Sequence, residues 1–248
     1  MKKSNFIYGI HPVEEAIQSG KTIDKVWVQE GTVSPALREV LGLLRDHRIL
    51  WKQVPAERLN RMVNGNHQGI IAALSAVDFA TIDQVVAMAY EKGEDPFLIV
   101  LDGVTDVRNF GAIARSAYCA GAHGIVVPEK GGAAINADAV KTSAGALMHI
   151  PVCRVQSLYH GLKLIKNSGL MLAGITEKAT TSLHEAALTG PVALILGDEE
   201  KGLATDTRKL CDVQFQIPMM KEGVGSLNVS VAAGVALYEV VRQRGLSI

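Results

Sequence analysis

The chain has 248 residues, in which 25 lysines and arginines balance 25 aspartates and glutamates. A formal net charge of zero argues against a protein that coats nucleic acid through bulk charge. The three cysteines form no CxxC pair or Cys/His metal motif, so we expect neither a disulfide framework nor a zinc site. The N-terminus lacks a continuous apolar stretch, and no window approaches the ~20 apolar residues of a membrane span. We therefore expect a packed cytoplasmic protein with no membrane partner.

Residues 1–76 are predicted to form a small α/β unit. Its expected helices cover residues 13–20, 35–47 and 56–63, with Pro12 and Pro55 at two of the starts and Gly20 at an end. Its expected strands cover residues 25–29, 49–54 and 70–74.

A polar loop at 64–69 precedes the last of these strands, and Arg58, Arg61 and His67 lie in or near it. Such a loop is either an ordinary surface turn or an edge that contacts nucleic acid. Residues 1–75 hold ten lysines and arginines against seven aspartates and glutamates, a charge of +3, while the remainder carries −3. This asymmetry favours contact between the N-terminal unit and a polyanion, although a random division of charge would look the same.

Residues 77–95 are interpreted as a linker. Thr81 and Asp83 are typical of the start of a short helix, and the sequence Lys92 to Pro96 is a charged break marked by glycine and proline.

Residues 96–248 alternate between apolar runs and helical patterns. Strands are predicted at 97–101, 124–128, 152–155, 170–175, 192–196 and 213–217, and helices at 109–120, 136–147, 157–167, 205–210 and after residue 228. This alternation predicts an α/β domain with a parallel sheet covered on both faces. Ligands of such sheets bind beyond the carboxyl ends of the strands.

The loop after the first of these strands carries polar groups where a dinucleotide-binding protein would have GxGxxG, and no P-loop is present either. Asp102 and Asp106 are interpreted as turn residues, because no third carboxylate is nearby. Asn109 suits a helix cap. Arg115 lies in an otherwise apolar helix, where it either extends to the surface or holds a phosphate with its planar fork.

Two further loops follow later strands. Gly197 to Leu203 is acidic and bounded by glycines, which suits close approach of an uncharged or cationic ligand and not of a phosphate. The stretch Ile217 to Asn228 leads through Gly223 and Gly225 into the last helix, with Ser226 and Asn228 as candidate caps. Three such loops at the ends of strands indicate an active site.

Together these loops resemble the three motifs of the SpoU/TrmH family of RNA ribose 2'-O-methyltransferases, within the SPOUT group. The first motif matches Asn109 to Arg115, the second Leu196 to Gly202, and the third Ile217 to Met219 with Ser226 to Ser230. Val107 replaces a proline that is common in the family, which removes no functional group.

The resemblance implies a deep trefoil knot in residues 96–248 and a homodimer formed through the knot domain. It implies that S-adenosylmethionine, and no metal, serves the reaction. The cofactor-binding residues would be Gly197, Ile217, Met219, Ser226 and Leu227. The catalytic set would be Asn109, Arg115, Glu199, Ser226 and Asn228. Arg115 would activate the ribose 2'-hydroxyl, or bind the neighbouring phosphate and orient that hydroxyl.

The N-terminal stretches Tyr8 to Ala16 and His67 to Ile70 are similar to the ribosomal-protein-like RNA-binding domain of the branch that methylates a guanosine of 23S ribosomal RNA. The expected RNA-binding residues are Arg58, Arg61, His67 and Arg115. Three alternatives remain: the same chemistry on tRNA, a resistance-type reaction elsewhere on ribosomal RNA, or a non-catalytic RNA-binding dimer.

Overall fold

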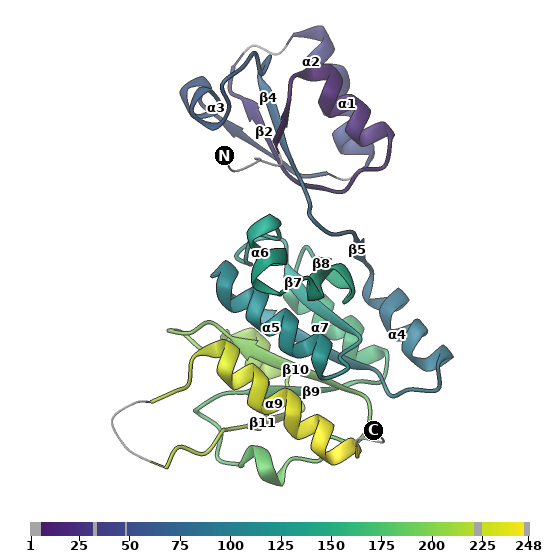
Figure 1. The fold of residues 1–248 in the computed structure, drawn as a ribbon, viewed down its shortest axis with the longest axis vertical. Helices are drawn as coiled ribbons and strands as arrows, with labels where there is room; N and C mark the ends of the chain where they lie inside the picture. Colours follow the sequence, from purple (N-terminus) through teal and green to yellow (C-terminus); the bar gives the residue numbers. More distant parts are fainter. Residues whose placement is uncertain (1–5, 32–33, 48, 221–224, 246–248) are drawn as a thin grey trace. The chain divides into compact units, whose positions relative to one another are not determined.

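The computed structural model describes residues 6–31, 34–47, 49–220 and 225–245. The chain divides into two compact units, Met1–Val77 and Asp78–Ile248 (Figure 1). Gly223 of the third loop lies outside the described residues.

The first unit is a four-stranded mixed sheet with helices. Its strand order is β1-β4-β2-β3, with β4 antiparallel to both neighbours and β2 parallel to β3. The strands are β1 Phe6–Tyr8, β2 Ile23–Gln29, β3 Trp51–Val54 and β4 Ile70–Leu74. The helices are α1 Ile10–Gln18, α2 Pro35–Asp46 and α3 Ala56–Met62. The predicted α/β character of this unit is confirmed.

Alternation along the strands places a separate apolar cluster on each face of this sheet. One cluster joins Val26 and Val28 of β2 to buried residues of α1 and α2, including Val13 and Leu44. The other is smaller and joins Leu59 of α3 to Ile71 of β4 and Val54 of β3. Because successive strand residues point to opposite faces, one strand can serve both clusters.

The second unit contains a seven-stranded sheet in the order β11-β9-β10-β6-β7-β8-β5, and all of its pairs are parallel. The strands are β5 Phe79–Ala80, β6 Phe97–Asp102, β7 Gly124–Pro128, β8 Val152–Val155, β9 Met171–Ile175, β10 Val192–Gly197 and β11 Val213–Phe215. The α-helices are α4 Ile82–Glu91, α5 Val107–Cys119, α6 Ala137–Thr142, α7 Leu158–Asn167, α8 Thr205–Leu210 and α9 Val229–Arg244. The predicted parallel sheet is confirmed.

Helices cover both faces of this sheet, as Figure 1 shows. An apolar cluster on one face joins strand residues such as Leu98 and Ile195 to α4 and α7, with α8 at its edge. Helix α5 packs against α9 and α6, and α9 also lies along β10. The central strands β6 and β10 are buried almost throughout, as expected for parallel strands covered on both sides.

The interpretation of residues 77–95 as a linker is wrong for most of its length. Strand β5 pairs with β8, and Ile82, Val85 and Val86 of α4 belong to the apolar cluster of the second unit. Thr81 forms a capping box with Gln84 at the start of α4. The segment looked like a linker because α4 is short and mixed in composition, but its apolar side is buried against the sheet.

The charged break after α4 is held to the same unit. The Nε2 atom of His123 lies 2.8 Å from a carboxylate oxygen of Glu94, and its Nδ1 accepts a hydrogen bond of 3.0 Å from the amide of Phe97. The hydrogen bond from His123 lowers the pKa of Glu94. Residues 94–97 therefore enter β6 along a fixed path.

Several element boundaries differ from the predictions by two or three residues, as at the start of α1, which begins at Ile10 and not at residue 13. Two differences in the second unit concern the path of the chain. The helix expected over 136–147 is divided into α6 and a short 3-10 helix, Ala146–Met148, because Ala144 and Gly145 have positive φ angles of 51° and 87°. Strand β11 ends at Phe215 and not at residue 217.

The strand order reverses beside β6. Strands β7 and β8 follow on one side of it, whereas β9, β10 and β11 lie on the other. A reversal of this kind leaves a crevice at the carboxyl ends of the adjacent strands, which is the usual ligand site of open parallel sheets. The loops that follow β6, β9 and β10 meet at this edge. The trefoil knot stays a prediction from the family resemblance.

Glu239 of α9 gives the second unit an acid-sensitive ion pair. Arg242 donates hydrogen bonds of 3.0 and 2.7 Å to its carboxylate, and Gln243 donates one of 2.7 Å. These partners, Arg242 foremost, lower the pKa of buried Glu239 to about 2. Because this pKa is below the ordinary value near 4.5, the pair stabilises the fold above pH ~4.5, and the contribution disappears as the pH falls towards 2.

We therefore expect Glu239→Gln to lower the melting temperature at pH 7, with the difference from the wild type shrinking between pH 4.5 and 2.5. Thermal unfolding followed by circular dichroism over this pH series measures both curves. A difference that stayed constant with pH would contradict the assigned ion pair.

Among the described residues, no helix is long and apolar enough to cross a membrane.

Candidate active site

The loop after β10 is held in a tight turn by hydrogen bonds to its own aspartate, Asp198. Asp198 Oδ1 accepts hydrogen bonds from the amides of Glu200, 2.9 Å, and Lys201, 3.0 Å, and these bonds lower the pKa of its carboxyl group. Backbone hydrogen bonds in both directions between Asp198 and Gly202 close the loop. Gly202 has a φ of 67°, in the left-handed region that favours glycine. Asp198 is therefore a structural residue, and the turn it holds is tight.

Gly197 leaves no room for a side chain. A Cβ atom on this residue would overlap the carbonyl group of Gly202 and the amide nitrogen of Leu203. The end of β10 is thus packed directly against the returning backbone of its own loop. The sequence predicted that a ligand approaches the backbone closely at this glycine. In the structure, the group that approaches Gly197 closely is the backbone of its own loop, at Gly202 and Leu203.

The two aspartates before α5 have turn roles, as expected. Asp106 is the N-cap of α5 and accepts hydrogen bonds from the amides of Arg108 and Asn109, at 2.7 and 3.0 Å, which lower its pKa. Asp102 accepts a hydrogen bond of 2.8 Å from the amide of Ala204, which ties the end of β6 to the loop after β10. The prediction that Asn109 caps this helix is wrong, because Asp106 occupies the cap and Asn109 lies inside the first turn.

The side chain of Asn109 is instead part of a cluster that joins all three loops. Its Nδ2 donates to Oε1 of Glu199, from the loop after β10. Asn228, at the start of α9, donates from Nδ2 to the same oxygen at 2.8 Å and to Oδ1 of Asn109 at 3.2 Å. We call Asn109, Glu199 and Asn228 the amide–carboxylate cluster. It brings together residues separated by up to 119 positions in the sequence.

Asn228 also caps α9. Its Oδ1 accepts hydrogen bonds from the amide and hydroxyl of Ser230, at 3.0 and 2.6 Å. The predicted cap at Asn228 is confirmed. Ser226 lies two residues before the cap, is exposed, and lines a cavity instead.

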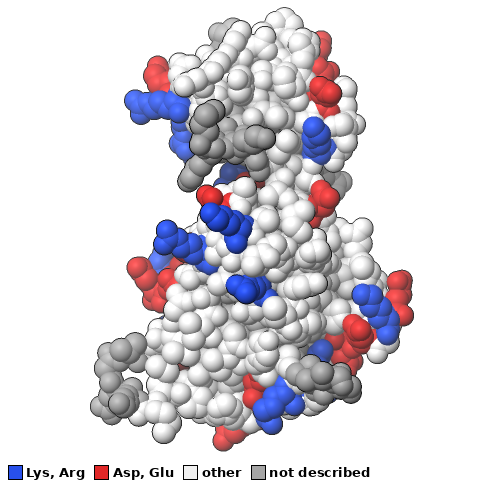
Figure 2. Space-filling view, in the orientation of Figure 1, with Lys and Arg blue, Asp and Glu red and all other residues white. Residues whose placement is uncertain are grey.

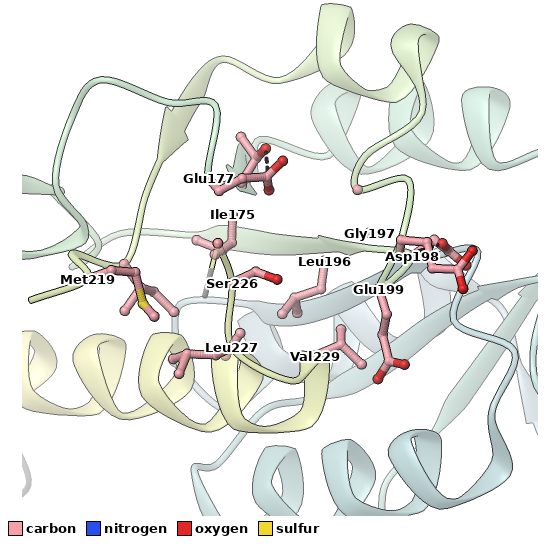
Figure 3. Close-up of a pocket in the computed structure, with 16 residues that line it drawn as sticks. Ile175, Glu177, Leu196, Gly197, Asp198, Glu199, Met219, Ser226, Leu227 and Val229 are labelled. Atoms are coloured by element: carbon pink, nitrogen blue, oxygen red, sulfur yellow. Dashed lines mark hydrogen bonds between the residues drawn. The ribbon is translucent and has the colours of Figure 1, made fainter. Parts of the chain in front are cut away.

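This cavity has a volume of about 290 Å³ and lies beyond the ends of β9 and β10 (Figure 3). Apolar side chains of Leu196, Ile217, Leu227 and Val229 form part of its wall. All five residues expected to bind a cofactor line it: Gly197, Ile217, Met219, Ser226 and Leu227. Glu199 lines it too, so the amide–carboxylate cluster is at its border.

Sequence reasoning missed the wall contributed by the end of β9, which consists of Ile175, Thr176 and Glu177. Ile175 pairs with Leu196 in the sheet, so the residues after it come alongside Gly197. The sequence carries no local signal for this segment, because it has no glycine-rich loop and its place beside Gly197 is set by the order of the strands in the sheet.

Arg115 is not among the residues that line this cavity or form the amide–carboxylate cluster. It is exposed on α5, six residues after Asn109. At 1.5 Å per residue and 100° per residue, it lies ~9 Å along the helix axis and ~120° around it from Asn109. Arg115 is thus exposed to solvent on a different side of α5 from Asn109.

In the first unit, His67 is buried and both ring nitrogens are used. Its Nδ1 accepts a hydrogen bond of 3.0 Å from the amide of Gly69, so Nε2 carries the proton and donates to Oδ1 of Asn60 at 2.9 Å. The expectation of an RNA contact from this ring therefore has no support in the structure. Arg58 and Arg61 on α3 are exposed and stay candidates.

The same loop is locked to the start of α1. Gln68 adopts a φ of 49°, and its side-chain oxygen accepts a hydrogen bond of 2.9 Å from the amide of Ile10. Tyr8 packs so closely on Gly65 that a Cβ atom there would lie 2.7 Å from its ring. The polar loop is therefore a defined surface and not a loose connection.

No group of three or more histidine, cysteine, aspartate or glutamate side chains in the described ranges could hold a metal ion. Burial raises the pKa of Cys153 to about 12 and that of Cys211 to about 11, so these thiols stay protonated at neutral pH. The site thus consists of an amide–carboxylate cluster and a cavity with apolar and acidic walls.

Comparison with known proteins decides the family. The SpoU rRNA Methylase family matches residues 96–238, and the RNA 2'-O ribose methyltransferase substrate-binding domain matches residues 6–80. The chain belongs to the SpoU rRNA methylase family. YacO of Bacillus subtilis, named as a TrmH family tRNA/rRNA methyltransferase, is 36% identical over 243 residues, covering 98% of this chain and 97% of YacO.

Solved structures of SpoU proteins have the same fold. The SpoU methyltransferase AviRb from Streptomyces viridochromogenes is 27% identical with a TM-score of 0.62, and the alignment covers 96% of this chain and 89% of AviRb. AviRb has also been solved in complex with the cofactor AdoMet, and that structure superposes with a TM-score of 0.60. An RNA 2'-O ribose methyltransferase structure, 28% identical, superposes with a TM-score of 0.57 over 96% of this chain and 88% of its own. The predicted family is confirmed.

Proposed function

We propose that this SpoU-family protein transfers a methyl group from S-adenosylmethionine to the ribose 2'-hydroxyl of a guanosine in 23S ribosomal RNA. The observation that carries the proposal is the convergence of the three family motifs. Asn109, Glu199 and Asn228 form one hydrogen-bonded cluster at the border of the cavity that holds the five expected cofactor-binding residues.

The residues present fit the methyl donor. The apolar side chains of Leu196, Ile217 and Leu227 suit the adenine ring. Gly197 has no side chain, so a ligand in the cavity can approach its backbone. The described lining residues include no lysine or arginine, which agrees with a donor that has no phosphate. When bound, S-adenosylmethionine supplies a methyl group on a sulfonium, an electrophile for an oxygen nucleophile.

The amide–carboxylate cluster fixes the positions of the loops around the reaction. Glu199 Oε1 receives two amide donors, one from α5 and one from the start of α9, so each loop is oriented by the other two. Holding reactants in the right geometry is worth several kcal/mol of the barrier. We assign Arg115 to the RNA phosphate next to the target ribose, because its exposed fork is free to bind an anion and arginine is not normally deprotonated in proteins.

The first unit is proposed to bind ribosomal RNA. It matches the family's substrate-binding domain, and Arg58 and Arg61 lie exposed beside the locked polar loop. Lysines and arginines are spread over the face of the molecule in Figure 2 without forming one continuous basic area. Recognition by shape and by a few placed contacts fits this distribution better than binding through bulk charge.

We propose a homodimer formed through α9. This helix exposes Val231, Val235 and Tyr238, which are 50%, 38% and 52% exposed and share one side at i, i+4 and i+7 spacing. The opposite side of α9 is buried in the second unit through Ala233, Ala236, Leu237 and Val240. An apolar row on a helix already packed on its other side is suited to a second copy of the chain.

Val235→Glu is expected to convert the dimer to a monomer, because it places a charge in the centre of this row. Sedimentation velocity or light scattering after size exclusion measures the mass. Val231→Ser serves as a milder variant with an intermediate effect. A wild-type chain that is monomeric at micromolar concentration would contradict the dimer.

The function is tested by methyl transfer from labelled S-adenosylmethionine to unmodified 23S ribosomal RNA, 16S ribosomal RNA and bulk tRNA, followed by mapping of the modified nucleotide. We expect label at one 2'-hydroxyl of 23S ribosomal RNA. Label confined to tRNA or to 16S ribosomal RNA would keep the chemistry and overturn the substrate. If the protein did not bind S-adenosylmethionine, the proposed enzymatic activity would be overturned and a non-catalytic RNA-binding dimer would be favoured.

A further inference from the structure

Four carboxylates line the donor cavity, and the loops account for two of them. Asp198 builds its own turn, and Glu199 holds Asn109 and Asn228. Glu200 is exposed at the border. Glu177, which follows β9, is the remaining carboxylate. Neither the amide–carboxylate cluster nor the turn after β10 uses it.

The backbone places Glu177 firmly. The amide of the preceding residue, Thr176, donates 2.9 Å to the carbonyl of Phe215 in β11. The hydroxyl of Thr176 accepts from the amide of Lys178 at 3.3 Å and lies 3.3 Å from Oε2 of Glu177. Thr176 itself is buried. The turn after β9 is therefore tied to the sheet, and the Glu177 carboxylate is presented from a fixed backbone.

The carboxylate lies across the cavity from the start of α9, as Figure 3 shows for Glu177 and the segment Ser226 to Val229. It is also close to the tight turn, since a Cβ atom on Gly202 would lie 3.8 Å from its Oε1. The side chain is 46% exposed, and it forms a long ion pair with Lys178, whose Nζ lies 4.0 Å from Oε1. Lys178 is itself more exposed than Glu177 and does not line the cavity.

The charge of the wall is consequently one-sided. The described lining residues hold four carboxylates and no lysine, arginine or histidine. A negatively charged cavity wall lowers the free energy of a bound cationic ligand. It does not stabilise a neutral ligand of the same shape to a comparable extent. S-adenosylmethionine carries a net charge of +1 at neutral pH, whereas the demethylated product, S-adenosylhomocysteine, is neutral overall.

We infer that Glu177 is a specificity residue of the donor site that recognises the positive charge of the methyl donor and thereby favours it over the spent product. This inference rests on the proposed function, because it concerns the same cavity. Loss of the methyl group removes the charge that Glu177 attracts, so the product is held less tightly than the donor.

The test compares the binding of both ligands to the wild type, to Glu177→Gln and to Glu91→Gln by isothermal titration calorimetry at low ionic strength. Glutamine keeps the size of the side chain and removes its charge. Glu91 is an exposed carboxylate on α4 that does not line the cavity, so its variant controls for the change of net charge. The whole chain is used, without RNA, so that turnover plays no part.

We expect Glu177→Gln to raise the Kd of S-adenosylmethionine about tenfold, equivalent to ~1.4 kcal/mol, and that of S-adenosylhomocysteine less than twofold. Glu91→Gln is expected to change neither. In the wild type, the ratio of the Kd of S-adenosylhomocysteine to that of S-adenosylmethionine is also expected to decrease as salt is added. The decrease should be smaller in Glu177→Gln.

Equal weakening of both ligands would overturn the inference, since Glu177 would then contact a group that they share, such as the ribose hydroxyls. No change in either Kd would overturn it as well. Failure of the wild type to bind either ligand would instead overturn the proposed function, so the two failures are distinguishable.

Discussion

Arg115→Ala is expected to reduce methyl transfer to RNA by about 100-fold or more, equivalent to ~2.7 kcal/mol of the barrier. The residue is exposed on α5, outside the cavity proposed for the donor and outside the amide–carboxylate cluster. Its removal should therefore leave the fold and the donor site intact, while the target ribose loses the contact that orients it. Single-turnover kinetics with saturating RNA measures the loss.

Arg115→Lys is the matched variant for this prediction. Lysine keeps the charge but loses the planar fork that binds a phosphate through two hydrogen bonds, so an intermediate rate is expected. The Kd for S-adenosylmethionine and the melting temperature should be unchanged in both variants. Near-normal transfer by Arg115→Ala would remove Arg115 from the catalytic set.

Gly197→Ala is expected to abolish binding of S-adenosylmethionine at millimolar concentrations and to lower the melting temperature. The added methyl group would overlap the backbone of Gly202 and Leu203, and backbone cannot move aside as the end of a long side chain can. Either the turn after β10 opens or the strand shifts, and both changes displace the cavity wall and Glu199. Overpacking of this kind typically costs ~1–3 kcal/mol.

Gly190→Ala is the control for this prediction. Gly190 lies shortly before β10, has no atom within 4 Å of an added Cβ, and does not have a positive φ. We expect the Gly190→Ala variant to have the same Kd for S-adenosylmethionine and the same melting temperature as the wild type. If Gly197→Ala bound the donor with normal affinity, the tight turn would not be needed for the cavity, and the assignment of Gly197 would be wrong.

The sequence predicted the second unit well because burial leaves a local pattern. The run Phe97 to Leu101 and the run Val192 to Leu196 are apolar throughout, which is typical of strands covered on both faces, and they are the buried β6 and β10. The family motifs were also readable, since each is a short stretch with fixed residue types. All five expected cofactor residues line one cavity for this reason.

Local patterns were less informative where one residue type fits several roles. Asparagine is a common helix cap, but Asp106, three residues before Asn109, occupies the cap and leaves the side-chain Nδ2 of Asn109 to donate to Glu199. His67 is part of a loop with the composition of a polar surface turn, yet its ring is buried and both of its nitrogens form hydrogen bonds. In each case the choice depends on a competing partner, and its position is set by the folded chain.

The sequence by itself determined the strands, the family motifs and the division into an N-terminal and a C-terminal unit. Tertiary structure decided that residues 79–91 belong to the second unit, that Glu177 lines the cavity beyond β9 and β10, and that Asn109, Glu199 and Asn228 meet. The physical reason is that periodicity records which face of a segment is buried and not which segment buries it. The order of strands in the sheet supplies that information, because it places the ends of β6, β9 and β10 side by side.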